Sequence, residues 1–290
     1  MIKKIGVLSG VLTATALAAA AAVPASASQA GPARPASNTR PAPAPPGSQT
    51  QYTQGAPGYG ATNSSGFEQA TETTTLVRDT NVFSSSYQPF VSLENSTTST
   101  STPEVELIPT ATSSSSPVDS WNPNADDSTS GNTASFFWVQ PRPYPANSPC
   151  AGNTDSRGCF YVGETVTLTV SYNTGSGKAY MTIADPSNGD EYVASLPYST
   201  ATSGALTTAH LGDVWLAAYE GQAFTPPNRQ TNLNSFSSVL LTDASGHTKP
   251  LGDWTHFERI MTSTGANTGK VEITPSPLSW DGKSFSLTVK

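Results

Sequence analysis

Short stretches in which apolar and polar residues alternate recur through the second half of the chain. The clearest covers residues 165–172, where valine, leucine, valine and tyrosine alternate with threonine and serine. A period of two is typical of a β-strand with one buried face. Similar patterns predict further strands over residues 105–108, 179–183, 191–196, 214–220, 236–242, 256–261, 270–274 and 285–289.

Turn-forming residues separate these predicted strands. Residues 173–177 (Asn-Thr-Gly-Ser-Gly) and 186–190 (Pro-Ser-Asn-Gly-Asp) predict a meander of three strands, and Asp281-Gly282 indicates a hairpin before the last one. No stretch of the mature chain shows a convincing amphipathic helix. The pattern therefore predicts an all-β fold, a two-sheet antiparallel jelly roll or concanavalin-like sandwich.

The first 63 residues differ in composition from the rest. Residues 1–27 have a basic start, an apolar stretch and Ala25-Ser26-Ala27, which together indicate a cleaved secretory signal peptide, with an N-terminal membrane anchor as the alternative. Residues 28–63 are rich in Pro, Ala and Ser and predict a disordered linker. We assign residues 64–290 to the sandwich domain. We therefore expect a secreted or extracellular protein, and one alternative within this is a protein associated with the cell wall.

Composition excludes some classes of function. Only 12% of residues are charged, the net charge is −7, and Lys and Arg are scattered, so a basic surface for nucleic acid is absent. No later stretch is long and apolar enough for a membrane span. We expect a monomer. The Ser- and Thr-rich stretch 95–133 predicts long mobile loops around the short strand at 105–108.

The two cysteines are Cys150 and Cys159, and eight residues of turn character separate them. In an oxidising compartment we expect them to form one local disulfide. Metal ligation is the alternative, but this spacing without histidine neighbours matches no zinc pattern. His256 and Glu258 would share one strand face, which also permits metal binding, although such a pair is more often solvated. We predict neither a metal site nor a cofactor.

Six segments resemble, in the same order, the bacterial type of the secreted glutamic peptidases, the eqolisins. The last is Val271 to Thr288, which is similar to the C-terminal stretch of that family. Upstream, the matches are Ser-Gly-Phe at 65–67, Phe-Val-Ser-Leu-Glu-Asn at 90–95, Phe-Trp-Val-Gln-Pro at 137–141, Val-Gly-Glu-Thr-Val at 162–166 and Val-Trp-Leu at 214–216. The resemblance extends over residues 64–290.

This resemblance implies a two-sheet jelly roll that cleaves peptides in acid, with a Gln and a Glu on its concave sheet. Carried over residue by residue, the catalytic Gln position falls on Leu107 and the catalytic Glu position on Ala218, so both catalytic groups are replaced. Glu220 would share a strand face with Ala218 and is the fallback base, or else a solvated carboxylate at the strand end. Gln140 is a weaker fallback for the amide.

Two hypotheses follow for function. In the first, the protein is a pseudoenzyme, an extracellular binding module that takes a peptide or a carbohydrate at the concave face. Trp138 is then the candidate binding ring, because it falls where the family has Glu, although a buried Trp138 is an equal alternative. In the second, the protein is an acid endopeptidase that uses Glu220.

Overall fold

The structure is a computed structural model in which all described residues belong to one compact unit, Pro41–Lys290. The described residues are 49–77, 87–95, 104–111, 119–126, 131–133, 137–140, 159–161, 163–187, 189–200, 204–215 and 233–290. The predicted signal peptide (1–27) and the first part of the predicted linker (28–48) lie outside them.

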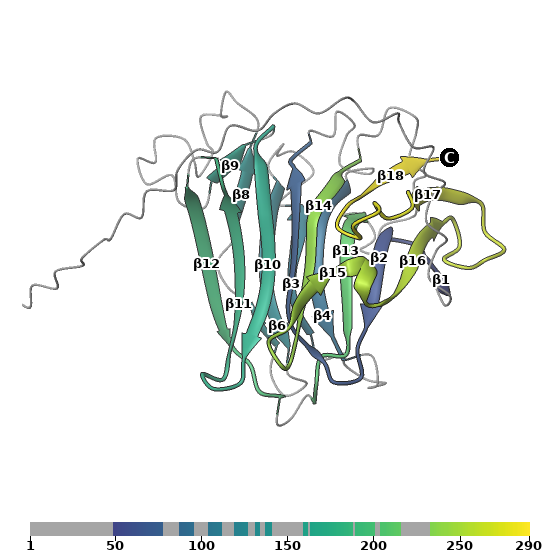
Figure 1. Ribbon diagram of the computed structural model, residues 1–290. Coiled ribbons are helices and arrows are strands. Elements are labelled where there is room, and N and C mark those ends of the chain that lie inside the picture. The colour runs from purple at the N-terminus through teal and green to yellow at the C-terminus, as the bar shows by residue number, and fades with distance from the viewer. Residues whose placement is uncertain are drawn as a thin grey trace, which may run out of the picture. The chain divides into compact units, whose positions relative to one another are not determined.

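The described residues form 18 strands in two layers joined at one end (Figure 1). The first sheet pairs, in spatial order, β1 (Gln49–Thr53), β16 (Thr255–Thr262), β2 (Gly58–Thr62), β13 (Thr208–Trp215), β4 (Tyr87–Glu94), β5 (Glu104–Ala111), β6 (Asp119–Asp126), β8 (Phe137–Gln140) and β9 (Cys159–Tyr161). The strand β7 (Gly131–Thr133) also pairs with β6. All these pairings are antiparallel except β1 with β16 and β8 with β9.

The second sheet pairs β12 (Asp190–Pro197), β11 (Lys178–Asp185), β10 (Thr165–Asn173), β3 (Phe67–Thr75), β14 (Ser235–Asp243) and β15 (Thr248–Pro250). A single 3-10 turn, η2 (Leu251–Asp253), follows β15. The hairpin of β17 (Val271–Pro275) and β18 (Phe285–Val289) connects the layers, because β17 pairs with β16 while β18 also pairs with β14. The predicted all-β, two-sheet sandwich is confirmed.

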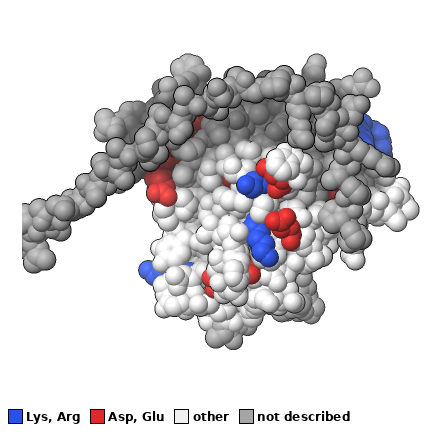
Figure 2. Space-filling view, in the orientation of Figure 1, with Lys and Arg blue, Asp and Glu red and all other residues white. Residues whose placement is uncertain are grey.

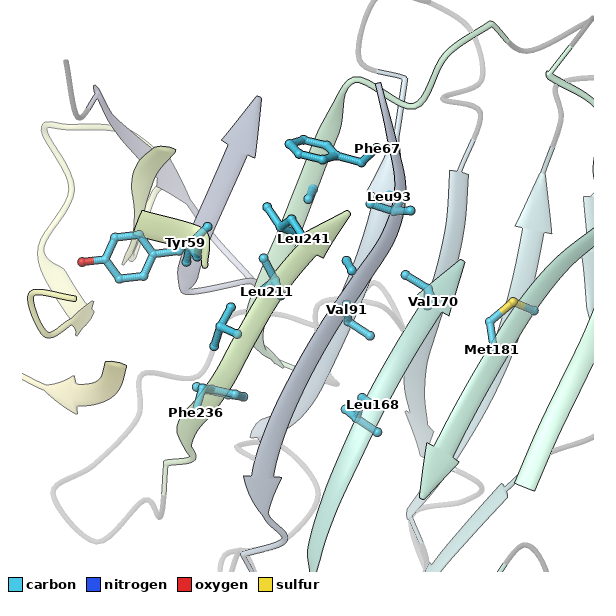
Figure 3. Close-up of a cluster of buried hydrophobic side chains, with 14 of the residues drawn as sticks. Tyr59, Phe67, Val91, Leu93, Leu168, Val170, Met181, Leu211, Phe236 and Leu241 are labelled. Atoms are coloured by element: carbon cyan, nitrogen blue, oxygen red, sulfur yellow. The ribbon is translucent and has the colours of Figure 1, made fainter. Parts of the chain in front are cut away.

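The core lies between the two sheets and explains the alternating pattern. Val166, Leu168 and Val170 of β10 are fully buried, and their polar neighbours along the strand are not. Figure 3 shows Leu168 and Val170 in the same cluster as Val91 and Leu93 of β4. The predicted meander is also confirmed, since β10, β11 and β12 pair in succession.

The opposite face of the second sheet carries hydroxyl groups. Cross-strand hydrogen bonds join three pairs of threonines at 2.9 to 3.1 Å, namely Thr71 with Thr169, Thr73 with Thr167 and Thr75 with Thr165. Such pairs each stabilise a sheet by roughly 0.2 to 1 kcal/mol. The view in Figure 2, which has this sheet toward the viewer, is mostly uncharged.

The predicted linker over residues 28–63 is wrong for its last part. Residues 49–53 form β1, and β2 lies inside the first sheet between β13 and β16, with Tyr59 and Ala61 buried in the core. Two glycines of this segment are required by packing. A Cβ at Gly60 would overlap the ring of Phe257, and one at Gly58 would overlap the carbonyl of Leu211.

Two other predictions need adjustment. The stretch 95–133, predicted to be loops around one short strand, also contains β6 and β7. The strand β6 pairs with β5 and β8, and β7 pairs with β6. The strand predicted over 214–220 is described only to Trp215, and it begins earlier, at Thr208. The hairpin at Asp281-Gly282 is confirmed, and Gly282 has φ +68°, a left-handed conformation that favours glycine.

Candidate functional site

The face of the first sheet that points away from the core carries a buried acid and base. Ser92 and Glu94 on β4 alternate with the core residues Val91 and Leu93, and Ser92 lies opposite His210 of β13 in register. The side chains of Glu94 and His210 meet, with 3.3 Å between Oε2 and Nε2. We call Ser92, Glu94, His210 and the neighbouring Phe257 the outer-face cluster.

The carboxylate of Glu94 is held in its charged form. Burial alone would raise its pKa, but hydrogen bonds from His210 and from the Ser92 hydroxyl, at 2.8 Å, and the charge of Arg259 lower it to about 2. At any pH above this value Glu94 is an anion and has no proton to give. It therefore acts as an acceptor for its neighbours and is not suited to be a general acid.

The His210 ring is almost fully enclosed. It is 7% exposed, and the Phe257 ring packs edge-on against it with 5.9 Å between centroids. Burial and the positive charge of Arg259 lower its pKa. We therefore assign the neutral ring at neutral pH, with Nε2 donating to Glu94. The other ring nitrogen, Nδ1, has no hydrogen-bond partner among the described residues.

A second polar cluster lies between the sheets, among core residues. Glu72 of β3 accepts a hydrogen bond from the backbone N–H of Gly212 at 3.1 Å, and Asp213 of β13 accepts two from Asn234, at 2.6 Å from its side chain and 3.2 Å from its backbone. Thr74 donates to the backbone carbonyl of Ser235 beside it. Both carboxyl groups are 0% exposed. We call Glu72, Asp213 and Asn234 the inter-sheet cluster.

Burial changes the protonation of these two carboxyl groups. It raises the pKa of Asp213 to about 7, against the opposing effect of the hydrogen bonds from Asn234. Burial, together with the negative charge of Asp213, raises the pKa of Glu72 well above its usual range. Proton affinities of this kind suit a general acid or base. However, a substrate cannot reach side chains that are enclosed between two sheets.

Only part of the sequence-predicted site falls on described residues. Ala218, Glu220 and Cys150 lie outside them, so the disulfide with Cys159 stays a prediction. In the backbone register, position 107 lies opposite Val91, whereas position 106 lies opposite Ser92 of the outer-face cluster. Position 138 lies opposite Ser120 and Cys159, and position 140 lies opposite Tyr161.

The sequence did not reveal either polar cluster. Glu94 and Asp213 both fall within or beside segments that resemble the family, but nothing in their spacing indicated partners.

His256, which was considered as a metal ligand with Glu258, is 8% exposed and packs against Tyr59, with Nδ1 2.9 Å from the carbonyl of Trp254. Among the described residues, no three His, Cys, Asp or Glu side chains gather in a way that could hold a metal ion. No helix in the described part of the chain is long and apolar enough to span a membrane.

Comparison with solved structures finds matches to two peptidases and to a CBM2 module. Scytalido-glutamic peptidase with a transition state analog inhibitor is 12% identical with a TM-score of 0.48, and SCP-B, an eqolisin in complex with the tripeptide Ala-Ile-His, is 11% identical with a TM-score of 0.46. Each match covers 83% of this chain and 98% of the other. The CBM2 module of the Lactobacillus casei BL23 phage J-1 evolved Dit is 12% identical over 58% of this chain and 67% of its own, with a TM-score of 0.31.

Comparison by sequence finds no match. No family model matches the chain, and no curated protein is similar enough in sequence to match it.

Proposed function

We propose that this protein is an extracellular binding module with an eqolisin-like β-sandwich and without glutamic peptidase activity. Its ligand is a peptide or a carbohydrate, bound at the face of the first sheet that carries the outer-face cluster. The proposal includes export by residues 1–27 and a sandwich that acts as a monomer. A working acid endopeptidase is the competing hypothesis.

The observation that carries the proposal is the state of the described carboxyl groups near the first sheet. Glu94 is held by His210 and Ser92, and its lowered pKa of about 2 makes it a weak base. Glu72 and Asp213, whose proton affinities would suit catalysis, are enclosed in the core. The sequence resemblance adds that Leu107 and Ala218 occupy the catalytic positions, and neither side chain can transfer a proton or stabilise an oxyanion.

The peptidase question is tested by digesting an unfolded protein substrate, reduced and alkylated casein, between pH 2 and pH 5. We expect no turnover by the wild type. The Glu220→Gln and Glu106→Gln variants belong in the same assay, because Glu220 is the fallback base and position 106 lies opposite Ser92. Turnover that disappears in either variant would overturn the proposal in favour of the endopeptidase.

The binding question is tested with two classes of probe, the peptide mixture from a complete casein digest and a set of soluble oligosaccharides. We expect one class to bind, and the Trp138→Ala change to weaken that binding. Tyr52→Ala, a substitution of an aromatic side chain that lies 38% exposed, is the matched control. If neither class binds at millimolar concentration, the proposed ligand class is wrong.

A further inference from the structure

Trp280 is almost entirely in solvent. Its side chain is 94% exposed, whereas tryptophan is on average one of the more buried residue types. It lies in the connection between β17 and β18, which the sequence analysis used as a hairpin signal and as part of the family resemblance, without a role for Trp280. An indole this exposed contributes nothing to the core, and its ring face is open to a ligand.

The backbone around Trp280 is fixed by a dense set of hydrogen bonds. The Ser279 hydroxyl donates to Asp281 at 2.6 Å, and the Ser279 oxygen accepts from the backbone N–H groups of Lys283 and Ser284 at 3.2 and 2.9 Å. Ser279 also accepts at its carbonyl from the Gly282 N–H at 2.8 Å. Trp280 is therefore held at the tip of a closed turn.

The same turn is anchored to the body of the sandwich. The carbonyl of Gly282 accepts from the N–H of Gly252 in η2 at 3.1 Å, and the carbonyl of Lys283 accepts from the N–H of Val239 in β14 at 3.0 Å. The two glycines pack so closely that a Cβ at Gly252 would come within 2.7 Å of the Gly282 Cα. A ring presented on a rigid support loses less conformational entropy on binding than one on a mobile loop.

The surroundings of the ring limit what it can bind. Its chain neighbours Ser279, Asp281 and Lys283 are polar, and one acid and one base leave the turn without net charge. The other exposed large hydrophobic side chains of the described part are Tyr52 on β1 and Val193 on β12. A stable protein interface needs about 800 Å² from each partner, which one ring with polar flanks does not supply.

A membrane surface and an acidic polymer are also unsuitable ligands for the turn that carries Trp280. Peripheral membrane binding combines a broad apolar face with cationic side chains, whereas this chain has a net charge of −7. A sugar ring, in contrast, has about the area of one indole. It offers an apolar C–H face for stacking and hydroxyl groups at its edge that a nearby acid and base can hydrogen-bond.

We propose that Trp280 is the stacking platform of a second binding site, which takes one pyranose ring of a neutral polysaccharide. The site consists of the Trp280 ring with the Lys283 ammonium and Oδ2 of Asp281 as edge contacts. The other carboxylate oxygen of Asp281, Oδ1, is already held within the turn by the Ser279 hydroxyl and the Lys283 backbone N–H. It is separate from the outer-face cluster and does not depend on which ligand that cluster takes.

The test is affinity electrophoresis of the full chain in native gels that contain hydroxyethylcellulose, laminarin or galactomannan, with carboxymethylcellulose as an anionic comparison. We expect at least one neutral polymer to slow the wild type. Trp280→Ala should weaken binding by at least about tenfold, which corresponds to about 1.4 kcal/mol. Trp280→Phe should keep most of it, because it retains a flat ring. Tyr52→Ala is the matched control for an exposed aromatic residue and should behave as the wild type.

The melting temperature provides a check on folding, since a side chain in solvent can be removed without loss of core packing. The proposal is overturned if no neutral polymer slows the wild type, if only the anionic polymer does, or if Trp280→Ala and Tyr52→Ala behave alike. If binding depends on Trp138 and not on Trp280, this inference fails while the proposed function stands.

Discussion

The inter-sheet cluster makes folding stability depend on pH in an unusual direction. Asp213 has a pKa of about 7 in the fold against 3.8 for the free side chain, because burial disfavours its charge. An acid whose pKa is raised by folding stabilises the fold fully below its unfolded pKa and loses that contribution as pH rises through its folded pKa. The stability should therefore fall between pH 4 and pH 7.

The size of the effect follows from the shift. About three pKa units at about 1.4 kcal/mol each give a loss of roughly 4 kcal/mol between pH 4 and pH 7 from Asp213 alone. Glu72, whose pKa is also raised, acts in the same direction. Since native domains are stable by only about 5 to 15 kcal/mol, this is a large part of the total.

The assay compares wild type with Asp213→Asn by urea unfolding, followed by circular dichroism, at several pH values from 4 to 7. Asparagine keeps the shape and removes the titrating proton, and the side-chain amide of Asn234 can rotate to accept from it. The free energy of unfolding of the variant, minus that of the wild type, should rise by about 4 kcal/mol from pH 4 to pH 7. The difference between the two proteins cancels the titration of Glu94 and His210, which both retain.

A surface control removes the same charge elsewhere. Glu191→Gln, on the exposed part of β12, should shift stability by less than about 0.5 kcal/mol at every pH. The reasoning is refuted if the difference between Asp213→Asn and wild type is constant from pH 4 to pH 7. It is also refuted if the surface control shows the same pH dependence.

Three other outcomes are expected. Glu94→Gln should lower the free energy of unfolding by about 1 to 3 kcal/mol at neutral pH, measured by urea unfolding. The difference from the wild type should vanish as the pH falls towards 2, because the lowered pKa of Glu94 makes its stabilising contribution present above pH 4.5 and lost below. Gly60→Ala should cost about 1 to 3 kcal/mol through overlap with Phe257, and Phe257→Ala in the same chain should relieve most of that penalty in thermal melts; additive losses would contradict the packing argument. Reduction of the predicted Cys150–Cys159 disulfide should raise hydrogen exchange over residues 141–160 and leave the strands protected. Faster exchange throughout the domain, or no change in the loop, would contradict the predicted local disulfide.

Local pattern was enough for the strands whose partners are also neighbours in sequence. In β10 apolar and hydroxyl residues alternate strictly, and in β11 the buried residues Ala179, Met181 and Ile183 take every second position. The turn between the two strands is short, so local pattern placed both strands and their pairing. The hairpin at Asp281-Gly282 was equally local, because the turn needs a residue with positive φ and glycine supplies it.

Glycine had the opposite meaning in β2, and the sequence could not show it. Residues 58–62 have the composition of a linker, yet they form a central strand, because β13 and β16 provide its hydrogen bonds and the Phe257 ring occupies the space over Gly60. A glycine selected for close packing looks, in sequence, the same as one selected for flexibility.

The two polar clusters depended entirely on tertiary structure. Glu72 follows the strand periodicity of β3 and takes an inward position between Ala70 and Thr74, but its hydrogen bond is to Gly212, 140 residues away. The sequence fixes which side of a strand a carboxyl group faces. Whether that side is solvent or a closed core, and which donors meet the carboxyl group there, is decided by how the strands pair, and that sets its proton affinity.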